Sequence, residues 1–225
     1  SPTGLAAGTY YLTIADMNSC QLDTTITITQ PSTAIGITRI DSLDVKCFGS
    51  NTGKVRIYVN GGTAGYTYVW SPNVSTTDSA INLAAGNYSV TASDANGCSV
   101  SVAVTVRQPT AALSFTAQSS TNVSCKNGNN GTATVTVAGG TPNYTYTWSP
   151  NVSTTSTANT LTAGSYNLTV TDANNCSIST SFTITEPTQL VANISQTNVL
   201  CNGASTGSIT ITASGATPSY TYTWN

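Results

Sequence analysis

The same residues return at a fixed interval along this chain, and the interval limits the folds that it can adopt. Pro31, Pro109 and Pro187 lie 78 positions apart, as do three of the six cysteines. An interval this long is that of a small domain rather than of one turn of a solenoid. We therefore expect the C-terminal part of a repeat at 1–31, complete repeats at 32–109 and 110–187, and the N-terminal part of a repeat at 188–225. Because both terminal stretches are incomplete repeats, we expect the chain to be a window on a longer array.

Each repeat reads as a series of short strands. In TATVTVAGG (132–140), the side chains of Ala133, Val135 and Val137 fall on one face and the threonines on the other. Asn96-Gly97 supplies the positive φ values that a hairpin turn favours. No segment has apolar residues at the helical period of 3.6. The pattern predicts an all-β fold, a tandem array of immunoglobulin-like antiparallel β-sandwich domains.

A Leu-x-Ala-Gly-x-Tyr step precedes one strand in each repeat and ends at Tyr10, Tyr88 and Tyr166. It resembles the tyrosine corner of immunoglobulin-like sandwiches, in which the phenol bonds back to the backbone of its own corner. The alternative is a tyrosine that only packs at the start of a strand.

An aromatic row, YTYxW, is the most conspicuous repeated strand. Residues two apart share a face, so Tyr144, Tyr146 and Trp148 line up. A repeat this small needs large apolar side chains to close its core, which favours Trp70, Trp148 and Trp224 as core residues. The alternative is a sugar-stacking platform, but the Asp, Asn and Arg side chains that such sites add are sparse here.

Two cysteines stand in each complete repeat, and paired cysteines in a small all-β unit predict disulfides and an oxidising setting. Two pairings compete. Pairing within a repeat joins Cys47 to Cys98 and Cys125 to Cys176, and the constant span of 51 residues favours it. Pairing across the junctions would instead join Cys20–Cys47, Cys98–Cys125 and Cys176–Cys201.

Composition argues against several classes of function. Charged residues make up 6% of the chain, the net charge is −2 and histidine is absent, so nucleic-acid binding and general acid–base catalysis have no candidate residues. We expect no enzyme, no cofactor, no metal site and no membrane-spanning segment. Asp94 and Asp172 recur in a turn where an aspartate most simply caps its own hairpin, with calcium binding as the alternative.

The combined motif C-x-G-x-x-x-G, GGTPxYTYTW, LxAGxYxVTVTDANGC and TITxP resembles the SprB-type repeat of very large surface adhesins in gliding Bacteroidota. The resemblance covers nearly the whole chain. Asn175 in place of the turn glycine and Ala64-Gly65 in place of the Pro-containing pair depart from it without affecting the fold. It implies a protein of the outer cell surface, exported by the type IX system, whose repeats form a filament. The implied partners are neighbouring repeats and the anchoring or motility machinery.

The same resemblance implies O-glycosylation. Surface proteins of this group carry sugar on Asp-Ser/Thr followed by a small or apolar residue, a pattern that Thr24, Ser42 and Ser79 fit.

The function that we expect is a stalk or filament segment of a secreted adhesin, which gives reach and mechanical continuity for attachment or gliding. Pro31, Pro109 and Pro187 stiffen the links between repeats. The alternatives are multivalent polysaccharide-binding repeats, or a sheath or fibre protein, with polysaccharide or abiotic surfaces as partners. Exposed side chains differ between the repeats, which favours the stalk.

Overall fold

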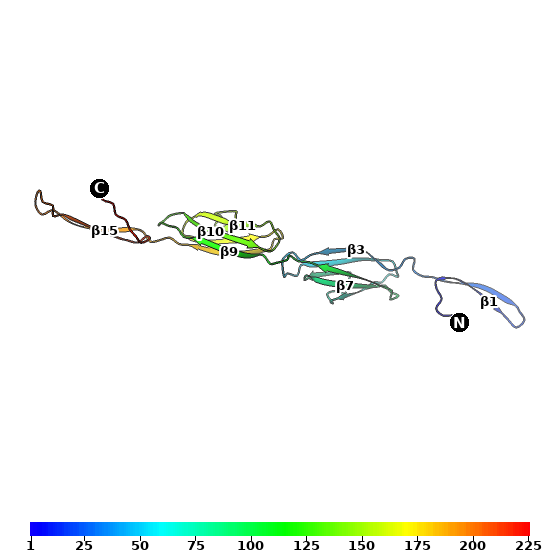
Figure 1. Cartoon of the computed structure of the whole chain (residues 1–225). Coiled ribbons are helices and arrows are strands. Elements are labelled where there is room, and N and C mark those ends of the chain that lie inside the picture. The colour runs from blue at the N-terminus through cyan, green and yellow to red at the C-terminus, as the bar shows by residue number, and fades with distance from the viewer. The chain divides into compact units, whose positions relative to one another are not determined.

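The computed structural model describes all residues, Ser1–Asn225, as β-strands and connecting loops without a helix (Figure 1). The prediction of an all-β fold made of immunoglobulin-like sandwiches is confirmed. Two compact units divide the chain, one with residues 1–45 and 49–108 and the other with residues 46–48 and 109–225. Each unit contains one complete sandwich and one separate hairpin.

The sandwich of the first unit has six strands in two antiparallel sheets. The sheet orders are β3-β4-β6 and β5-β7-β8. The strands are β3 (Gly36–Leu43), β4 (Gly53–Asn60), β5 (Thr67–Ser71), β6 (Ser79–Leu83), β7 (Gly86–Ser93) and β8 (Ser99–Val106).

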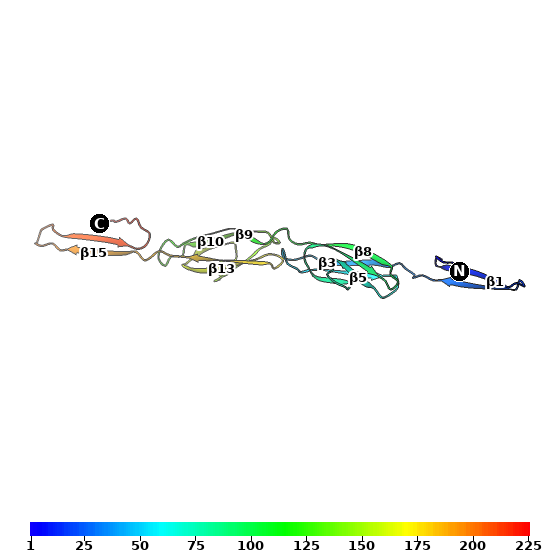
Figure 2. The same cartoon turned by 90° about the horizontal axis from the view of Figure 1, so that it is seen from below.

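The sandwich of the second unit repeats this plan. Its sheet orders are β12-β10-β9 and β11-β13-β14, and both views show the two layers (Figures 1 and 2). The strands are β9 (Ser114–Thr121), β10 (Gly131–Ala138), β11 (Thr145–Ser149), β12 (Thr157–Leu161), β13 (Gly164–Thr171) and β14 (Ser177–Ile184).

The two hairpins are half-sandwiches. One is β1 (Gly8–Ala15) with β2 (Gln21–Ile28), and the other is β15 (Val191–Thr197) with β16 (Ser208–Ser214). The two strands of each hairpin pair only with each other and form a two-stranded sheet (Figure 2). By register, β1–β2 corresponds to β7–β8, and β15–β16 corresponds to β3–β4.

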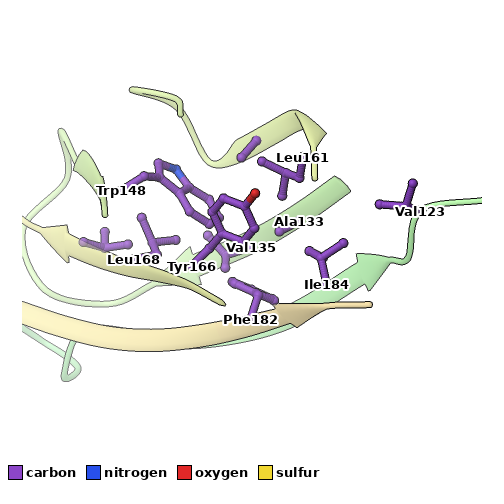
Figure 3. Packing of buried hydrophobic residues seen from close by; sticks show 11 residues of the cluster. Val123, Ala133, Val135, Trp148, Leu161, Tyr166, Leu168, Phe182 and Ile184 are labelled. Atoms are coloured by element: carbon purple, nitrogen blue, oxygen red, sulfur yellow. The ribbon is translucent and has the colours of Figure 1, made fainter. Parts of the chain in front are cut away.

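Alternation of side chains along each strand builds the core. On β4, Val55 and Ile57 are buried while Lys54 and Arg56 are exposed. In the second sandwich the buried residues of the two sheets meet between the layers, as Trp148 and Leu168 of one sheet and Val135 of the other do in Figure 3. The rings of Trp148 and Phe182 lie 5.8 Å apart, within the usual range for aromatic pairs.

The tryptophan of each sandwich also anchors the loop that follows it. Trp70 Nε1 donates a hydrogen bond to Thr77 O (2.8 Å), and Trp148 Nε1 donates to Thr155 O (2.9 Å). Both tryptophans are 2% exposed, so the indole N–H needs this acceptor. The repeated sequence WSPNVSTT is therefore explained by the fold: the ring fills the core, and a backbone carbonyl of the loop accepts the hydrogen bond of its indole N–H.

Trp224 does not follow the prediction that it is a core residue. It is 60% exposed, because β15 and β16 have no second sheet opposite them.

We expect Trp70→Ala to destabilise the first sandwich by about 3–5 kcal/mol, since it removes the largest core side chain and the hydrogen bond that the indole N–H donates to Thr77 O. Val69→Ala on the same strand is the matched control, because Val69 is 69% exposed. That change should cost less than about 1 kcal/mol. Urea denaturation followed by circular dichroism measures both, and equal losses would contradict this account of the core.

Candidate functional site

Tyrosine hydrogen bonds close the corner before one strand of each repeat. Tyr88 Oη donates to Ala84 O (3.0 Å), Tyr166 Oη to Thr162 O (3.0 Å) and Tyr10 Oη to Ala6 O (2.8 Å). Each bond spans four residues within the Leu-x-Ala-Gly-x-Tyr step, so the phenol fixes the corner to its own backbone.

A second set of tyrosine bonds was missed at the level of sequence. Tyr66 Oη donates to Gly61 O (2.6 Å) and Tyr144 Oη to Gly139 O (2.7 Å), and Tyr220 makes the same bond to Gly215. Each closes the loop that leads into the aromatic strand. The constant Gly-to-Tyr spacing of five residues was the available signal.

One buried aspartate per sandwich holds two loops together. Asp172 Oδ1 accepts from the backbone N–H of Asn174 (2.9 Å) and Cys176 (2.8 Å) within the β13–β14 turn. Its Oδ2 accepts from Thr141 N (2.8 Å) in the β10–β11 loop. Asp94 makes the three equivalent bonds in the first sandwich, including one from Thr63 N at 2.9 Å.

The hydrogen bonds lower the pKa of both carboxyls. For Asp94 the bond from Thr63 is the main cause, and it outweighs the effect of burial. Burial would raise the pKa of Asp172, but the N–H donors of Thr141, Cys176 and Asn174 together bring it below the ordinary value of 3.8. Both groups are therefore carboxylates at neutral pH. No group of three or more His, Cys, Asp or Glu side chains gathers around them or elsewhere in the structure.

The Gly-Gly pair before each aromatic strand makes room for the carboxylate. A Cβ on Gly140 would lie 2.5 Å from Asp172 Oδ2, and one on Gly62 would lie 2.6 Å from Asp94 Oδ2. Both glycines also have positive φ, a conformation that other residues rarely adopt. The glycines, the aspartate and the tyrosine above thus form one structural unit.

The first and last strands of each sandwich are joined directly where they end. Val45 N donates to Arg107 O (2.8 Å), and Arg107 N donates to Asp44 Oδ1 (2.8 Å). In the second sandwich Val123 N donates to Thr185 O (3.0 Å), and Thr185 N donates to Asn122 Oδ1 (2.9 Å). Because β3 and β8 end together, they run in the same direction, and tension on the two ends of a sandwich loads these bonds in shear.

The disulfide pairing differs from the prediction. The structure joins Cys47 to Cys176, with Cα atoms 5.7 Å apart, and leaves Cys20, Cys98, Cys125 and Cys201 as exposed thiols. The predicted bonds within a repeat, Cys47–Cys98 and Cys125–Cys176, are absent, and so is the set across the junctions.

The strand lengths explain why pairing within a repeat was wrong. Cys176 lies just before the first residue of β14. Cys125 lies near the other end of this strand, because Val123, two residues before it, donates to Thr185 O just after the last residue of β14. The two cysteines are therefore separated by the length of β14, roughly 25 Å. A disulfide needs Cα atoms within about 7 Å.

Further polar contacts seat the segment that carries Cys47. Residues 46–48 belong to the second compact unit, where Asn174 Nδ2 donates to Lys46 O (3.0 Å). Asn174 is itself held by Asp172 through its backbone N–H. The turn that Asp172 holds therefore positions Cys176, which forms the disulfide with Cys47, and the Asn174 amide, which donates to Lys46 O.

A charged patch on β3 and β4 has no counterpart in the second sandwich. Arg39 and Arg56 both lie over the Tyr58 ring, at 5.3 and 5.0 Å from its centroid. Asp41 accepts from Tyr58 Oη and pairs with Arg39, which holds the pKa of its carboxyl below the ordinary value, and Asp78 pairs with Arg56. The second sandwich has Ala117, Thr134 and Thr136 at the positions of Arg39, Arg56 and Tyr58.

The residues predicted to carry sugar lie on strands. Thr24 on β2 and Ser42 on β3 are exposed, and Ser79 at the start of β6 is half-buried. Ser42 and Ser79 each follow an aspartate of the charged patch.

A family model described as "SprB repeat" matches residues 40–75, 117–153 and 193–225. A comparison with curated proteins finds no match. No helix of the length and apolar character that a bilayer crossing requires is present.

Several solved structures resemble the fold at low identity. The N-terminal eight Ig domains of Down Syndrome Cell Adhesion Molecule match with 12% identity over 80% of this chain and 28% of theirs, at a TM-score of 0.42. Extracellular domains 3–5 of Drosophila OTK match with 14% identity over 79% of this chain and 70% of theirs, at a TM-score of 0.36. Domains 1–6 of the surface layer protein SbsC match with 12% identity over 93% of this chain and 44% of theirs, at a TM-score of 0.28. The chain spans 28% of the length of the first of these.

We expect the stability that both carboxylates provide to depend on pH. A carboxyl group whose pKa is lower in the folded chain than in the unfolded chain stabilises the fold at pH values above the unfolded-state pKa. This stabilisation is lost as the pH falls below 3.8. An Asp94→Asn, Asp172→Asn double variant should be less stable than the unaltered chain at neutral pH. Between about pH 5 and about pH 3 it should lose less of its stability than the unaltered chain does. Thermal denaturation across this range measures it.

Asp16→Asn is the control, because the Asp16 carboxylate accepts only from the backbone N–H groups of Asn18 and Cys20 in its own hairpin turn. It should leave both sandwich transitions unchanged. A double variant whose pH profile matches that of the unaltered chain would contradict the assignment.

Proposed function

Because this chain is built from SprB repeats, we propose that it is a structural segment of an extracellular surface protein. In this proposal the repeats, with boundaries near residues 31, 109 and 187, form a stalk or filament of an adhesin. The segment supplies reach and mechanical continuity for surface attachment or gliding. Specific recognition resides in other parts of the parent protein.

The disulfide between Cys47 and Cys176 is the observation that carries this proposal. It links residues 129 positions apart, so most of both repeats lies within one covalent loop. The hydrogen bonds between first and last strands, such as Val45 to Arg107, resist tension in shear. Both devices suit a chain that is pulled from its ends.

The repeated aromatic residues support a structural role over ligand binding. Trp70 and Trp148 are buried, and Tyr66 and Tyr144 use their hydroxyls to close loops. The side chains that repeat are thus engaged inside the fold. The charged patch with Tyr58 occurs in one sandwich alone, whereas avidity would require it in each.

Mechanical extension tests the stalk proposal. With the chain held by its two ends, the disulfide should prevent about 129 residues from being drawn out, a difference of roughly 450 Å in full extension. Cys47→Ser or a reducing agent should restore this length in single-molecule force spectroscopy. Cys125→Ser is the matched control, because Cys125 is a free thiol, and it should change nothing. Equal lengths with and without the disulfide would contradict the proposal.

Export and modification belong to the same proposal. A surface protein of the type IX pathway with O-linked sugar at Thr24, Ser42 or Ser79 should react with antibody on intact cells. Its intact mass should exceed that of the polypeptide and return to it in a Thr24→Ala, Ser42→Ala, Ser79→Ala variant. Labelling only after permeabilisation would contradict surface export, and an unmodified mass would contradict glycosylation.

A further inference from the structure

Half of the cationic side chains of the chain gather on one face of the first sandwich. Arg39, Lys54 and Arg56 are three of its six Lys and Arg residues, and all three are exposed on β3 and β4. Asp41 and Asp78 lie beside them, so the patch carries three positive and two negative charges, whereas the whole chain has a net charge of −2. A local excess of positive charge on an acidic chain attracts negatively charged partners.

The Tyr58 ring holds two guanidinium groups in place. Arg39 and Arg56 both lie over it. Arg39 Nε donates to Asp41 (2.7 Å), and Arg56 Nε donates to Asp78 (3.0 Å). The terminal Nη groups of both arginines make no hydrogen bond, and the two side chains are 68% and 49% exposed. Each guanidinium therefore offers free N–H groups to an anion in an orientation that is already fixed.

A hollow lies beside these groups on β3 and β4. Its volume is about 210 Å³, which gives room for one sugar residue of a polymer. It is lined by Asp41, Ser42, Leu43, Lys54, Arg56 and Tyr58. Lys54 makes no ion pair, and its cross-strand neighbour Leu43 is 49% exposed. Cations, a carboxylate acceptor and an apolar wall are thus brought together here, although such side chains are sparse in the rest of the chain.

We propose that this hollow binds the carboxylate-bearing residue of an acidic polysaccharide, such as a uronic acid. Lys54 and the Nη groups of Arg56 bind the sugar carboxylate, and Leu43 contacts the C–H face of the ring. Asp41 accepts from a sugar hydroxyl. An acidic peptide lacks such hydroxyls, and its carboxylates would repel Asp41, so the site favours sugar over peptide.

This inference does not depend on the stalk proposal. A single charge-assisted site holds a polymer weakly, and it leaves specific recognition to other parts of the parent protein. Failure of the binding test below would leave the mechanical test of the stalk unaffected.

The second sandwich contains the same sheet without the site. The charged positions of the patch are small there, namely Ala117, Ser119, Thr132, Thr134 and Ser156. Because β9 and β10 pair in the same register as β3 and β4, the fold does not require the charges. The second sandwich therefore also provides substitutions that the sheet tolerates.

Binding of the whole chain to polygalacturonate, a polymer of a carboxylated sugar, tests the proposal. Affinity electrophoresis should show retardation by polygalacturonate and none by neutral dextran, and the retardation should fall as the salt concentration rises. A sulfated galactan and polyglutamate should each bind more weakly than polygalacturonate. No retardation by polygalacturonate, or tighter binding of the sulfated or the peptide polymer, would overturn the proposal.

Variants separate the site from the net charge of the chain. A Lys54→Thr, Arg56→Thr double variant copies Thr132 and Thr134 and should weaken binding to polygalacturonate about 10-fold or more, because it removes both cations of the hollow. An Arg107→Thr, Lys126→Thr double variant is the matched control, because it removes two positive charges outside the patch. It should bind like the unaltered chain. Circular dichroism checks that both variants fold, and equal losses of binding in the two would refute the site.

Discussion

A single buried carboxylate organises one end of each sandwich. Asp172 accepts backbone N–H groups from two loops, two from its own turn and one from Thr141, which lies 31 residues earlier in the chain. Burial makes any loss of these bonds costly. Its approach requires Gly140, and the turn that it shapes presents both Cys176 and Asn174. The loop, the turn and the disulfide therefore all depend on one side chain, which Asp94 matches in the first sandwich.

Features encoded by neighbouring residues could be predicted from the sequence, whereas features that depend on distant strands could not. Alternation such as Val55-Arg56-Ile57 sets the face that a strand buries, and it was enough for the all-β sandwich. Disulfide pairing depends on which strand ends meet, and the equal spacing of cysteines carries no information about that. Burial of Trp224 requires an opposite sheet, which its own hairpin lacks.

The side chains that recur between repeats are those that the fold itself uses. Trp70 and Trp148 bind the same loop position, and Tyr88 and Tyr166 close the same corner. The outward positions of β4 and β10 differ, with Arg56 and Tyr58 in one and threonines in the other. What is held constant is a folding unit whose first and last strands are joined by the same shear-resistant hydrogen bonds.

The charged patch has a consequence for folding in an array. Tandem neighbours with shared sequence, here WSPNVSTT at 70–77 and 148–155, are prone to exchange strands with one another. In the native register Asp41 faces Arg56 and Arg39 faces Tyr58. If β3 paired with β10 instead, these charges would face Thr134 and Thr136, the positions that match Arg56 and Tyr58. Each lost cross-strand pair costs about 0.2–1 kcal/mol, so the patch lets the first strand of one repeat discriminate against its neighbour.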